Sequence, residues 1–323
     1  MTKAIRFTET GGPEVLRLTE VELPAPAAGE IRLRQSAIAV NFIDTYHRSG
    51  LYPVKLPSGL GLEAVGIVEA IGAGVTEFAV GDRAGYCTGP IGAYAEAHNL
   101  PAARAVKIPD AISDDIAASI LMKGMTSEYL LRRTYPVKPG ETILFHAAAG
   151  GVGQVACQWA KALGATVIGT VGSDAKVGLA KSFGCDHVIV SSRENIADRV
   201  MDITGGKGVP VSYDGVGKDT FEASIASLAT RGVLVSFGNA SGAVPPFSPA
   251  ILSPKSLYLT RPGLFGYTGT TAELRDSAEA LFDVILTGKV KIAAPAVYAL
   301  ADAAKAHEDL QARKTTGSII LKP

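Results

Sequence analysis

The sequence predicts an α/β protein that combines a β-rich region with a doubly wound parallel sheet. In the first third of the chain, short apolar stretches alternate with turn residues. After residue 139, strand-like and helix-like segments alternate regularly. Glycine is also abundant, with 36 of 323 residues, about 11% against a usual value of about 7%. Because single cores stop growing near ~250–300 residues, a chain of this length is expected to form two domains.

The first 110 residues are expected to form strands rather than helices. Apolar and polar residues alternate over Ala4–Phe7, Glu30–Ala37 and Gly66–Ile71, and turn sequences such as Gly11-Gly12-Pro13 separate these stretches. A helical period of 3.6 residues becomes visible only near Ile112.

A second pattern starts at Pro139-Gly140, where strands begin to alternate with helices of about ten residues. The expected strands are 141–146, 166–171, 187–190, 209–214, 233–237 and 257–260, and the expected helices are 154–163, 175–183, 196–203 and 220–228. This order predicts a parallel, doubly wound sheet. Beyond Gly266 we expect a helix over 271–286, strands over 296–299 and 318–321, and a helix over 300–312 between them.

Composition excludes several classes of protein. The chain has 31 basic and 31 acidic residues, so its formal net charge is 31 − 31 = 0, which disfavours a nucleic-acid or membrane-surface partner. Neither a secretory signal nor a membrane span is expected from the apolar stretches. The three cysteines, Cys87, Cys157 and Cys185, are far apart and form no C-x-x-C motif, so a cytoplasmic protein without disulfides is expected.

A glycine-rich segment, residues 147–153, connects the first strand of the predicted parallel sheet to its first helix. At such a turn the pyrophosphate of a dinucleotide approaches backbone N–H groups, and the helix dipole favours its negative charge. Side chains at Gly150 or Gly151 would block this approach, and Gly153 allows the helix to pack closely on the strand. The alternative is a tight turn without a ligand. The strand–helix units that follow favour dinucleotide binding.

The end of the second strand indicates which dinucleotide binds. An acidic residue there would accept a hydrogen bond from the ribose 2′-hydroxyl of NADH. Here the strand runs into Gly172 and Ser173, and Lys176 follows, which suits the 2′-phosphate of NADPH. Asp174, shortly past the strand, argues against this interpretation, and Lys176 could also be an ordinary solvated lysine.

Other polar residues are candidates for catalysis. His146 precedes the glycine-rich segment and is the obvious candidate base, although its place at a strand end favours a structural role. Tyr46 and Tyr52 flank a loop and could stack on a planar ring, but core or interface tyrosines explain them equally well.

The segment Gly61–Gly66, followed by Gly72, Val75, Gly81 and Asp82, resembles the G-H-E signature of the medium-chain dehydrogenase/reductase superfamily. Leu62 stands where the zinc-binding members have histidine, and Asn41 stands at the position of their first cysteine ligand. Residues 120–126 contain no cysteine for the third ligand. No zinc site is therefore expected.

Within this superfamily the chain is similar to the zinc-free quinone oxidoreductases related to zeta-crystallin. The similarity is carried by residues 41–46, 48–53, 145–153 and 236–239. It implies a GroES-like catalytic domain formed by residues 1–123 and 266–323. A Rossmann dinucleotide-binding domain, residues 124–265, would be inserted between these parts.

The resemblance also implies roles for individual residues. Asn41, Tyr46 and Tyr52 would be catalytic, the tyrosines and Asn41 being the nearest candidate donors to the carbonyl oxygen of the substrate. The residues implied in coenzyme binding are Asn41, Phe42, Thr126, Gly150, Gly151, Val152, Gly172, Ser173, Lys176, Ser191, Val216, Phe237, Gly238, Asn239 and Arg313. Related bacterial enzymes carry tyrosine where this chain has Ser191, which can donate a hydrogen bond but cannot stack, so a weaker preference for NADPH is implied.

The function implied is NADPH-dependent reduction of quinones, without zinc or flavin, by direct hydride transfer or by single-electron transfer. The alternatives are reduction of other conjugated enones or enoyl substrates, and NADPH binding without catalysis. Nucleic-acid binding is disfavoured by the zero net charge. A homodimer is expected through the strand at 257–262, since an open apolar sheet edge is otherwise a liability.

Overall fold

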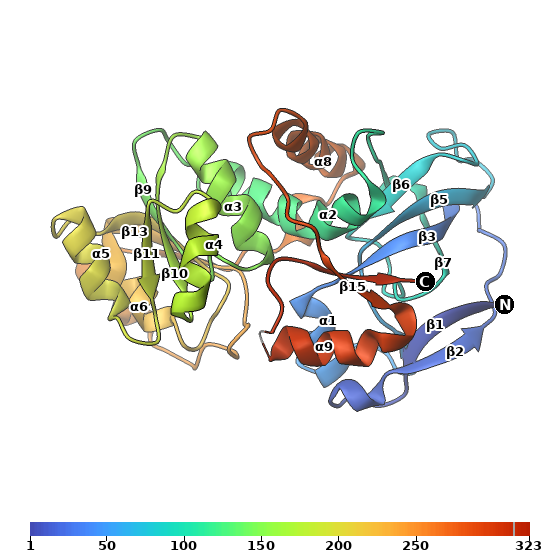
Figure 1. The fold of residues 1–323 in the computed structure, drawn as a ribbon, viewed down its shortest axis with the longest axis horizontal. Coiled ribbons are helices and arrows are strands. Elements are labelled where there is room, and N and C mark those ends of the chain that lie inside the picture. The colour runs from blue at the N-terminus through green and yellow to red at the C-terminus, as the bar shows by residue number, and fades with distance from the viewer. Residues whose placement is uncertain (313) are drawn as a thin grey trace. The chain divides into compact units, whose positions relative to one another are not determined.

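A computed structural model describes residues 1–312 and 314–323, and these divide into two units (Figure 1). The first unit contains residues 1–122, 268–282 and 293–323, and the second contains residues 123–267 and 283–292. The expected boundaries at 123/124 and 265/266 lie close to these, but residues 283–292 belong to the second unit. The side chain of Gln158 explains this: its amide donates to the carbonyl oxygen of Lys291 at 2.9 Å and accepts from the Lys291 N–H at 3.0 Å.

The first unit is built on two sheets, one of three strands in the order β2-β1-β4 and one in the order β15-β16-β3-β5-β6-β8, with β7 also paired to β3. The strands are β1 Thr2–Phe7, β2 Arg17–Val21, β3 Glu30–Val40, β4 Ser58–Gly59, β5 Ala64–Ile71, β6 Arg83–Tyr86, β7 Ala97–Pro101, β8 Val106–Lys107, β15 Ala296–Ala299 and β16 Ile319–Lys322. Strand β16 runs antiparallel to β3, with Ile320 opposite Ala39, so β15 and β16 join a sheet whose other strands lie within residues 30–107. This pairing also explains why β3 continues to Val40, three residues beyond its expected end.

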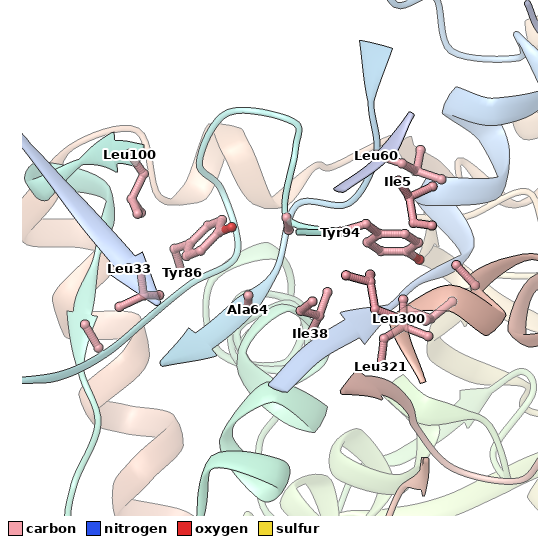
Figure 2. Close-up of a cluster of buried hydrophobic side chains, with 14 of the residues drawn as sticks. Ile5, Leu33, Ile38, Leu60, Ala64, Tyr86, Tyr94, Leu100, Leu300 and Leu321 are labelled. Carbon is pink, nitrogen blue, oxygen red and sulfur yellow. The ribbon is translucent and has the colours of Figure 1, made fainter. Parts of the chain in front are cut away.

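Four α-helices include residues of the first unit, and α2 and α8 continue into the second: α1 Phe42–Ser49, α2 Asp114–Tyr129, α8 Thr271–Leu286 and α9 Ala303–Gln311. Helix α1 was not expected from the sequence. A core of buried aliphatic and aromatic side chains lies among these strands and α9, and Figure 2 shows Tyr94 within it beside Ile5, Leu60 and Leu300.

The second unit contains a six-stranded sheet in the order β11-β10-β9-β12-β13-β14, in which every pairing is parallel. The strands are β9 Thr142–Phe145, β10 Thr166–Val171, β11 His187–Val190, β12 Val209–Asp214, β13 Leu228–Ser236 and β14 Tyr258–Thr260. The helices are α3 Gly151–Ala162, α4 Val177–Ser182, α5 Ile196–Thr204, α6 Phe221–Ser227 and α7 Leu264–Tyr267. Helices α3 and α4 cover one face of the sheet, and α5 and α6 cover the other (Figure 1). The predicted doubly wound parallel sheet is thus confirmed, and its order reverses between β9 and β12, where such sheets bind ligands.

Several elements differ from the expected ranges. Helix α3 begins at Gly151 rather than at residue 154, so two glycines of the turn, Gly151 and Gly153, already belong to the helix, whereas Gly150 is its extended N-cap residue. Strand β13 begins at Leu228 rather than at residue 233, with Arg231 at φ +62°. In the described part of the chain, no helix is both long and apolar enough to cross a membrane.

Candidate active site

The glycine-rich turn between β9 and α3 is shaped to accept an anion. Gly150 is the N-cap of α3, and the N–H groups of Gly151 and Val152 have no acceptor among the described residues. A Cβ atom on Gly150 would lie 3.1 Å from the carbonyl oxygen of Ala147, and one on Gly153 would lie 2.4 Å from that of Ala148. The turn therefore requires glycine at position 153. It leaves open N–H groups at a helix N-terminus, which is the requirement for binding a pyrophosphate.

His146 is enclosed in a hydrogen-bonded network at the end of β9. Its Nδ1 lies 3.2 Å from Oγ1 of Thr170, and its Nε2 lies 2.9 Å from Oγ of Ser224. Ser224 Oγ donates to Oδ2 of Asp214 at 2.9 Å, so we assign the imidazole proton to Nε2, from which it is donated to Ser224. Burial lowers the pKa of His146, with the carboxylate of Asp214 acting in the opposite direction. With 1% exposure, His146 is a structural link between strands rather than a base open to substrate.

Asp214 organises the loop that follows β12. Its Oδ1 accepts hydrogen bonds from the N–H groups of Val216 at 2.8 Å and Gly217 at 3.0 Å, and from Oγ1 of Thr220 at 2.8 Å. Asp214 was not predicted as a site residue. The sequence pattern that could have identified it is an acidic residue at the end of an apolar strand, followed directly by Gly215-Val216-Gly217.

The loop after β13 lies against the loop after β12. The N–H of Phe237 donates to the carbonyl oxygen of Asp214 at 2.8 Å, and a Cβ atom on Gly238 would lie 2.4 Å from the carbonyl oxygen of Gly215. Arg261 secures this loop by donating to the carbonyl oxygen of Gly238 at 2.9 Å. Asn239 follows in the same turn, so the structure brings together four of the predicted coenzyme residues: Val216, Phe237, Gly238 and Asn239.

The ends of β10 and β11 form a third part of this edge. Gly172 and Ser173 follow β10, and Lys176 ends a 3-10 turn, Asp174–Lys176, in which its N–H donates to Ser173 O at 3.1 Å. Ser191 follows β11, and its hydroxyl donates to the carbonyl oxygen of Val171 at 3.2 Å. The structure thus brings Ser191 to the end of β10, close to Gly172 and Ser173. The hydroxyl hydrogen of Ser191, however, is already donated to Val171 and is not available to a coenzyme. Arg313 lies outside the described residues.

Thr126 is buried on α2 in the second unit. The next residue, Ser127, has its hydroxyl 3.4 Å from the carbonyl oxygen of Val152 at the start of α3. Helix α2 therefore holds Thr126 near the glycine-rich turn.

Asn41 is held firmly at the N-terminus of α1 in the first unit. Its side-chain Nδ2 donates to Oε2 of Glu63 at 2.8 Å, and its backbone N–H donates to Oδ2 of Asp44 at 2.8 Å. Glu63 is fully buried, and its other oxygen, Oε1, accepts the N–H of Met122 at 2.8 Å. The carboxylate therefore orients the Asn41 amide, and Phe42 follows as the first residue of α1. Glu63 was not predicted as a site residue, although it stood out as an acid within the apolar segment Gly61–Gly66.

Tyr46 and Tyr52 are in contact. Their ring centroids lie 5.2 Å apart with the planes at 65°, and the N–H of Tyr52 donates to the carbonyl oxygen of Tyr46 at 3.1 Å. Both are partly exposed, which leaves surface for a planar ligand. Within the described residues the Tyr52 hydroxyl has no hydrogen-bond partner.

The described residues contain no group of three or more His, Cys, Asp or Glu side chains that could hold a metal ion. Leu62, which the resemblance predicts to replace a zinc-binding histidine, is a buried apolar side chain.

Comparison with known protein families assigns both parts of the chain. Residues 27–110 match the alcohol dehydrogenase GroES-like domain, and residues 151–285 match the zinc-binding dehydrogenase family. Together these matches define a dehydrogenase or reductase with a GroES-like domain and a Rossmann-type sheet, which confirms the predicted fold class.

Full-length relatives narrow this class. The chain is 54% identical to a quinone oxidoreductase of Pseudomonas aeruginosa over the whole of both chains. It is 42% identical to a 2-haloacrylate reductase of a Burkholderia species, over all of this chain and 99% of that one. Its structure matches that of the Escherichia coli quinone oxidoreductase complexed with NADPH, with a TM-score of 0.98 and 50% identity over 99% of this chain and 100% of that one. The chain belongs to the quinone oxidoreductases of the medium-chain dehydrogenase/reductase superfamily.

Proposed function

We propose that this protein is an NADPH-dependent quinone oxidoreductase that needs neither zinc nor flavin. The main support is its full-length similarity, at about half of all positions, to quinone oxidoreductases, one of them solved with NADPH. The glycine-rich turn supports it independently, since that turn tolerates no side chain at position 153 and presents the N–H groups of Gly151 and Val152, which have no acceptor in the described part of the chain.

The coenzyme would be held mainly by the second unit. Gly150, Gly151 and Val152 would receive the pyrophosphate, because a helix N-terminus favours an anion. Ser173, Lys176 and Arg313 would meet the 2′-phosphate. The other proposed contacts are Asn41, Phe42, Thr126, Gly172, Ser191, Val216, Phe237, Gly238 and Asn239.

When bound, NADPH supplies a hydride from its nicotinamide ring. The contribution of the protein would be orientation and stabilisation of charge. Asn41, whose amide is fixed by Glu63, would orient the reacting groups. Tyr46 and Tyr52 would contact the planar acceptor, one ring by its face and the other by its edge, because the ring planes stand at 65° to each other. The hydroxyl of Tyr52 would donate a hydrogen bond to the oxygen on which negative charge develops. Transfer of single electrons is the alternative route.

The reaction would not need a metal, because Leu62 and Asn41 occupy positions where zinc-binding relatives have ligands. We expect exhaustive treatment with a chelator to leave turnover unchanged, and a loss restored by zinc would contradict this part of the proposal.

The test of the proposal is an NADPH oxidation assay, followed by the loss of nicotinamide absorbance, with a panel of quinones, enals and 2-haloacrylate. Turnover of quinones at rates above those of the other acceptors supports the proposal. Faster turnover of the conjugated alkenes would favour the second candidate, an enone reductase, which the 42% identity to a 2-haloacrylate reductase supports. NADPH binding without any turnover would leave a coenzyme-binding protein. A radical signal during turnover would identify single-electron transfer.

We further propose a cytoplasmic homodimer. Strand β14 is at the edge of the six-stranded sheet, and the side chain of Tyr258 is 62% exposed there. The edge strand and its exposed aromatic ring favour pairing with a second copy through residues 257–262. Light scattering should give twice the chain mass, and Tyr258→Glu should shift the protein towards the monomer. The buried, unbridged cysteines suit a reducing compartment.

A further inference from the structure

Asp174 and Arg193 form an ion pair across the ends of two neighbouring strands of the six-stranded sheet. Nη2 of Arg193 lies 2.8 Å from Oδ1 of Asp174, and Nε lies 3.2 Å from Oδ1 and 3.4 Å from Oδ2. Asp174 comes shortly after β10, and Arg193 comes shortly after β11. Both side chains are exposed, so the pair adds little to stability.

The position of Asp174 bears on the choice of coenzyme. In sheets of this type, a carboxylate after the second strand accepts the ribose 2′-hydroxyl of NADH and would repel the 2′-phosphate of NADPH, whereas an arginine nearby accommodates that phosphate. Taken alone, Asp174 would favour NADH. The ion pair with Arg193 weakens this preference for NADH, because the guanidinium forms hydrogen bonds with both oxygens of the carboxylate.

In the described turns that directly follow β10 and β11, residues 172–176 and 191–195, Arg193 is the second cation beside Lys176. Lys176 has no ion-pair partner among the described residues, so Lys176, Arg193 and Asp174 together carry a net charge of +1. The hydroxyl hydrogen of Ser191 is already donated to the carbonyl oxygen of Val171. Glu194 is also near Arg193, at 3.7 Å, but lies closer to Arg199, at 3.1 Å.

Arg193 also has room to move. Asp174 and Arg193 both line a cavity of about 480 Å³ beside β11, together with apolar side chains such as Val177 and Val190. A change of side-chain rotamer can therefore turn the guanidinium away from the carboxylate without moving the backbone.

We propose that Arg193 is a specificity-determining residue that binds the 2′-phosphate of NADPH, and that Asp174 competes with this phosphate for the guanidinium. Arg193 thus supplies the recognition that Ser191 cannot, while Asp174 limits the preference for NADPH over NADH. This inference rests on the proposed NADPH-dependent function.

The experiment measures the Kd values of NADPH and NADH by calorimetry or nicotinamide fluorescence, without substrate, at several salt concentrations. Because a hydrogen bond to a charged group contributes strongly, Arg193→Ala should raise the Kd of NADPH about tenfold or more and change that of NADH by less than about threefold. Asp174→Asn should lower the Kd of NADPH by about twofold to fivefold. In the parent protein, added salt should reduce the ratio between the Kd values of NADH and NADPH, and in Arg193→Ala this reduction should be smaller.

Lys181→Ala is the matched control, since Lys181 is also a cation that lines the same cavity, near the other end of α4. It should leave the ratio of the two Kd values unchanged. The double variant Arg193→Ala/Asp174→Asn should bind NADPH more tightly than Arg193→Ala. In the single variant the unpaired carboxylate of Asp174 repels the 2′-phosphate, and the double variant lacks this charge.

Two failures are distinguishable. If the parent protein prefers NADPH and Arg193→Ala keeps the same ratio within twofold, the inference is wrong and the proposed function stands. If the parent protein binds neither dinucleotide, the proposed function fails and the inference fails with it. All variants should keep the thermal midpoint of the parent, because the pair is exposed.

Discussion

Arg48 and Asp44, both buried on helix α1, are connected by a chain of hydrogen bonds that passes through two other elements of the fold. Nη1 of Arg48 lies 3.1 Å from Nδ1 of His307 on α9, and Nε2 of His307 lies 3.0 Å from the hydroxyl of Tyr94. That hydroxyl lies 3.0 Å from Oδ2 of Asp44. The same carboxylate oxygen accepts the N–H of Asn41, so the chain of hydrogen bonds ends at a proposed catalytic residue.

The chemistry of the end groups sets the direction of every bond. Arg48 can only donate, so Nδ1 of His307 must accept and Nε2 must carry the proton. His307 then donates to Tyr94, and Tyr94 donates to the carboxylate of Asp44. Burial, and next the charge of Arg48, lower the pKa of His307 to about 3, so the imidazole stays neutral as this arrangement requires.

Replacement of His307 by leucine should destabilise the protein strongly. His307→Leu removes the acceptor of a buried guanidinium and the donor to a buried hydroxyl, and such losses cost about 3 kcal/mol. Urea denaturation should show a loss of this size in the free energy of unfolding. His187→Leu, at an exposed histidine of β11, is the control and should change that free energy by less than about 0.5 kcal/mol.

The protein should lose stability as the pH falls from 6.5 towards 5. Burial lowers the pKa values of His47, His98, His146 and His307 in the folded protein, whereas in the unfolded chain they titrate near 6.5. Below pH 6.5 the unfolded chain therefore binds protons that the folded protein does not, and the free energy of unfolding falls. Above pH 6.5 this contribution is fully present.

The carboxyl groups do not account for this pH window. Asp82, for example, has its pKa lowered by the hydrogen bond from Lys107, so its effect on stability begins only near pH 4. Thermal midpoints measured from pH 7.5 to 5 should fall continuously, with the steeper part below pH 6.5. A flat profile over this range would show that these histidines remain exposed to solvent.

His47→Leu should stabilise the protein. Nδ1 of His47 is buried and has no hydrogen-bond partner among the described residues, and the ring packs near Tyr52 with the centroids 6.2 Å apart. Leucine fills a similar volume without an unsatisfied polar atom, so the free energy of unfolding should rise by about 1 kcal/mol. A loss of stability would mean that an ordered water satisfies the imidazole.

Glu63→Gln tests whether Glu63 positions Asn41. The two carboxylate oxygens of Glu63 accept hydrogen bonds from the Asn41 side chain and the Met122 backbone N–H. Glutamine has one oxygen and one NH₂ group, so it can accept from only one of these two donors. The Asn41 amide should lose its fixed orientation, and kcat should fall about tenfold while the Kd of NADPH changes much less. Glu69→Gln, an exposed substitution on the same strand β5, should leave both values unchanged. Equal losses of kcat and of NADPH binding would instead indicate a general disturbance of the fold.

The parts of this structure that the sequence predicted depend on local patterns. Strands β10, β11 and β12 begin and end where expected. Strands β10 and β11 are short segments rich in β-branched residues, and β12 is a short, largely buried segment between Gly208 and Gly215. Helix α1 was missed because it is only eight residues long, and Gly50, at φ +83°, ends it as soon as it has formed. The roles of Glu63, Asp214 and Arg193 were not foreseen, because each depends on a partner distant in the chain or on a backbone path known only in three dimensions.

Gly153→Ala, compared with Gly178→Ala, tests the glycine-rich turn. A Cβ atom at position 153 would lie 2.4 Å from the carbonyl oxygen of Ala148 and 2.7 Å from that of Ala147. Because backbone atoms cannot move aside cheaply, helix α3 must shift away from β9, and the N–H groups of Gly151 and Val152 must move with it. We therefore expect a lower thermal midpoint and a Kd for NADPH raised at least about tenfold.

Gly178, on helix α4 of the same unit, is the control, because nothing lies within 4 Å of a Cβ atom added there. Gly178→Ala should consequently raise the free energy of unfolding by about 0.5–1 kcal/mol and leave NADPH binding unchanged. If both variants bound NADPH as the parent does, the close approach of α3 to β9 would not be needed for the coenzyme.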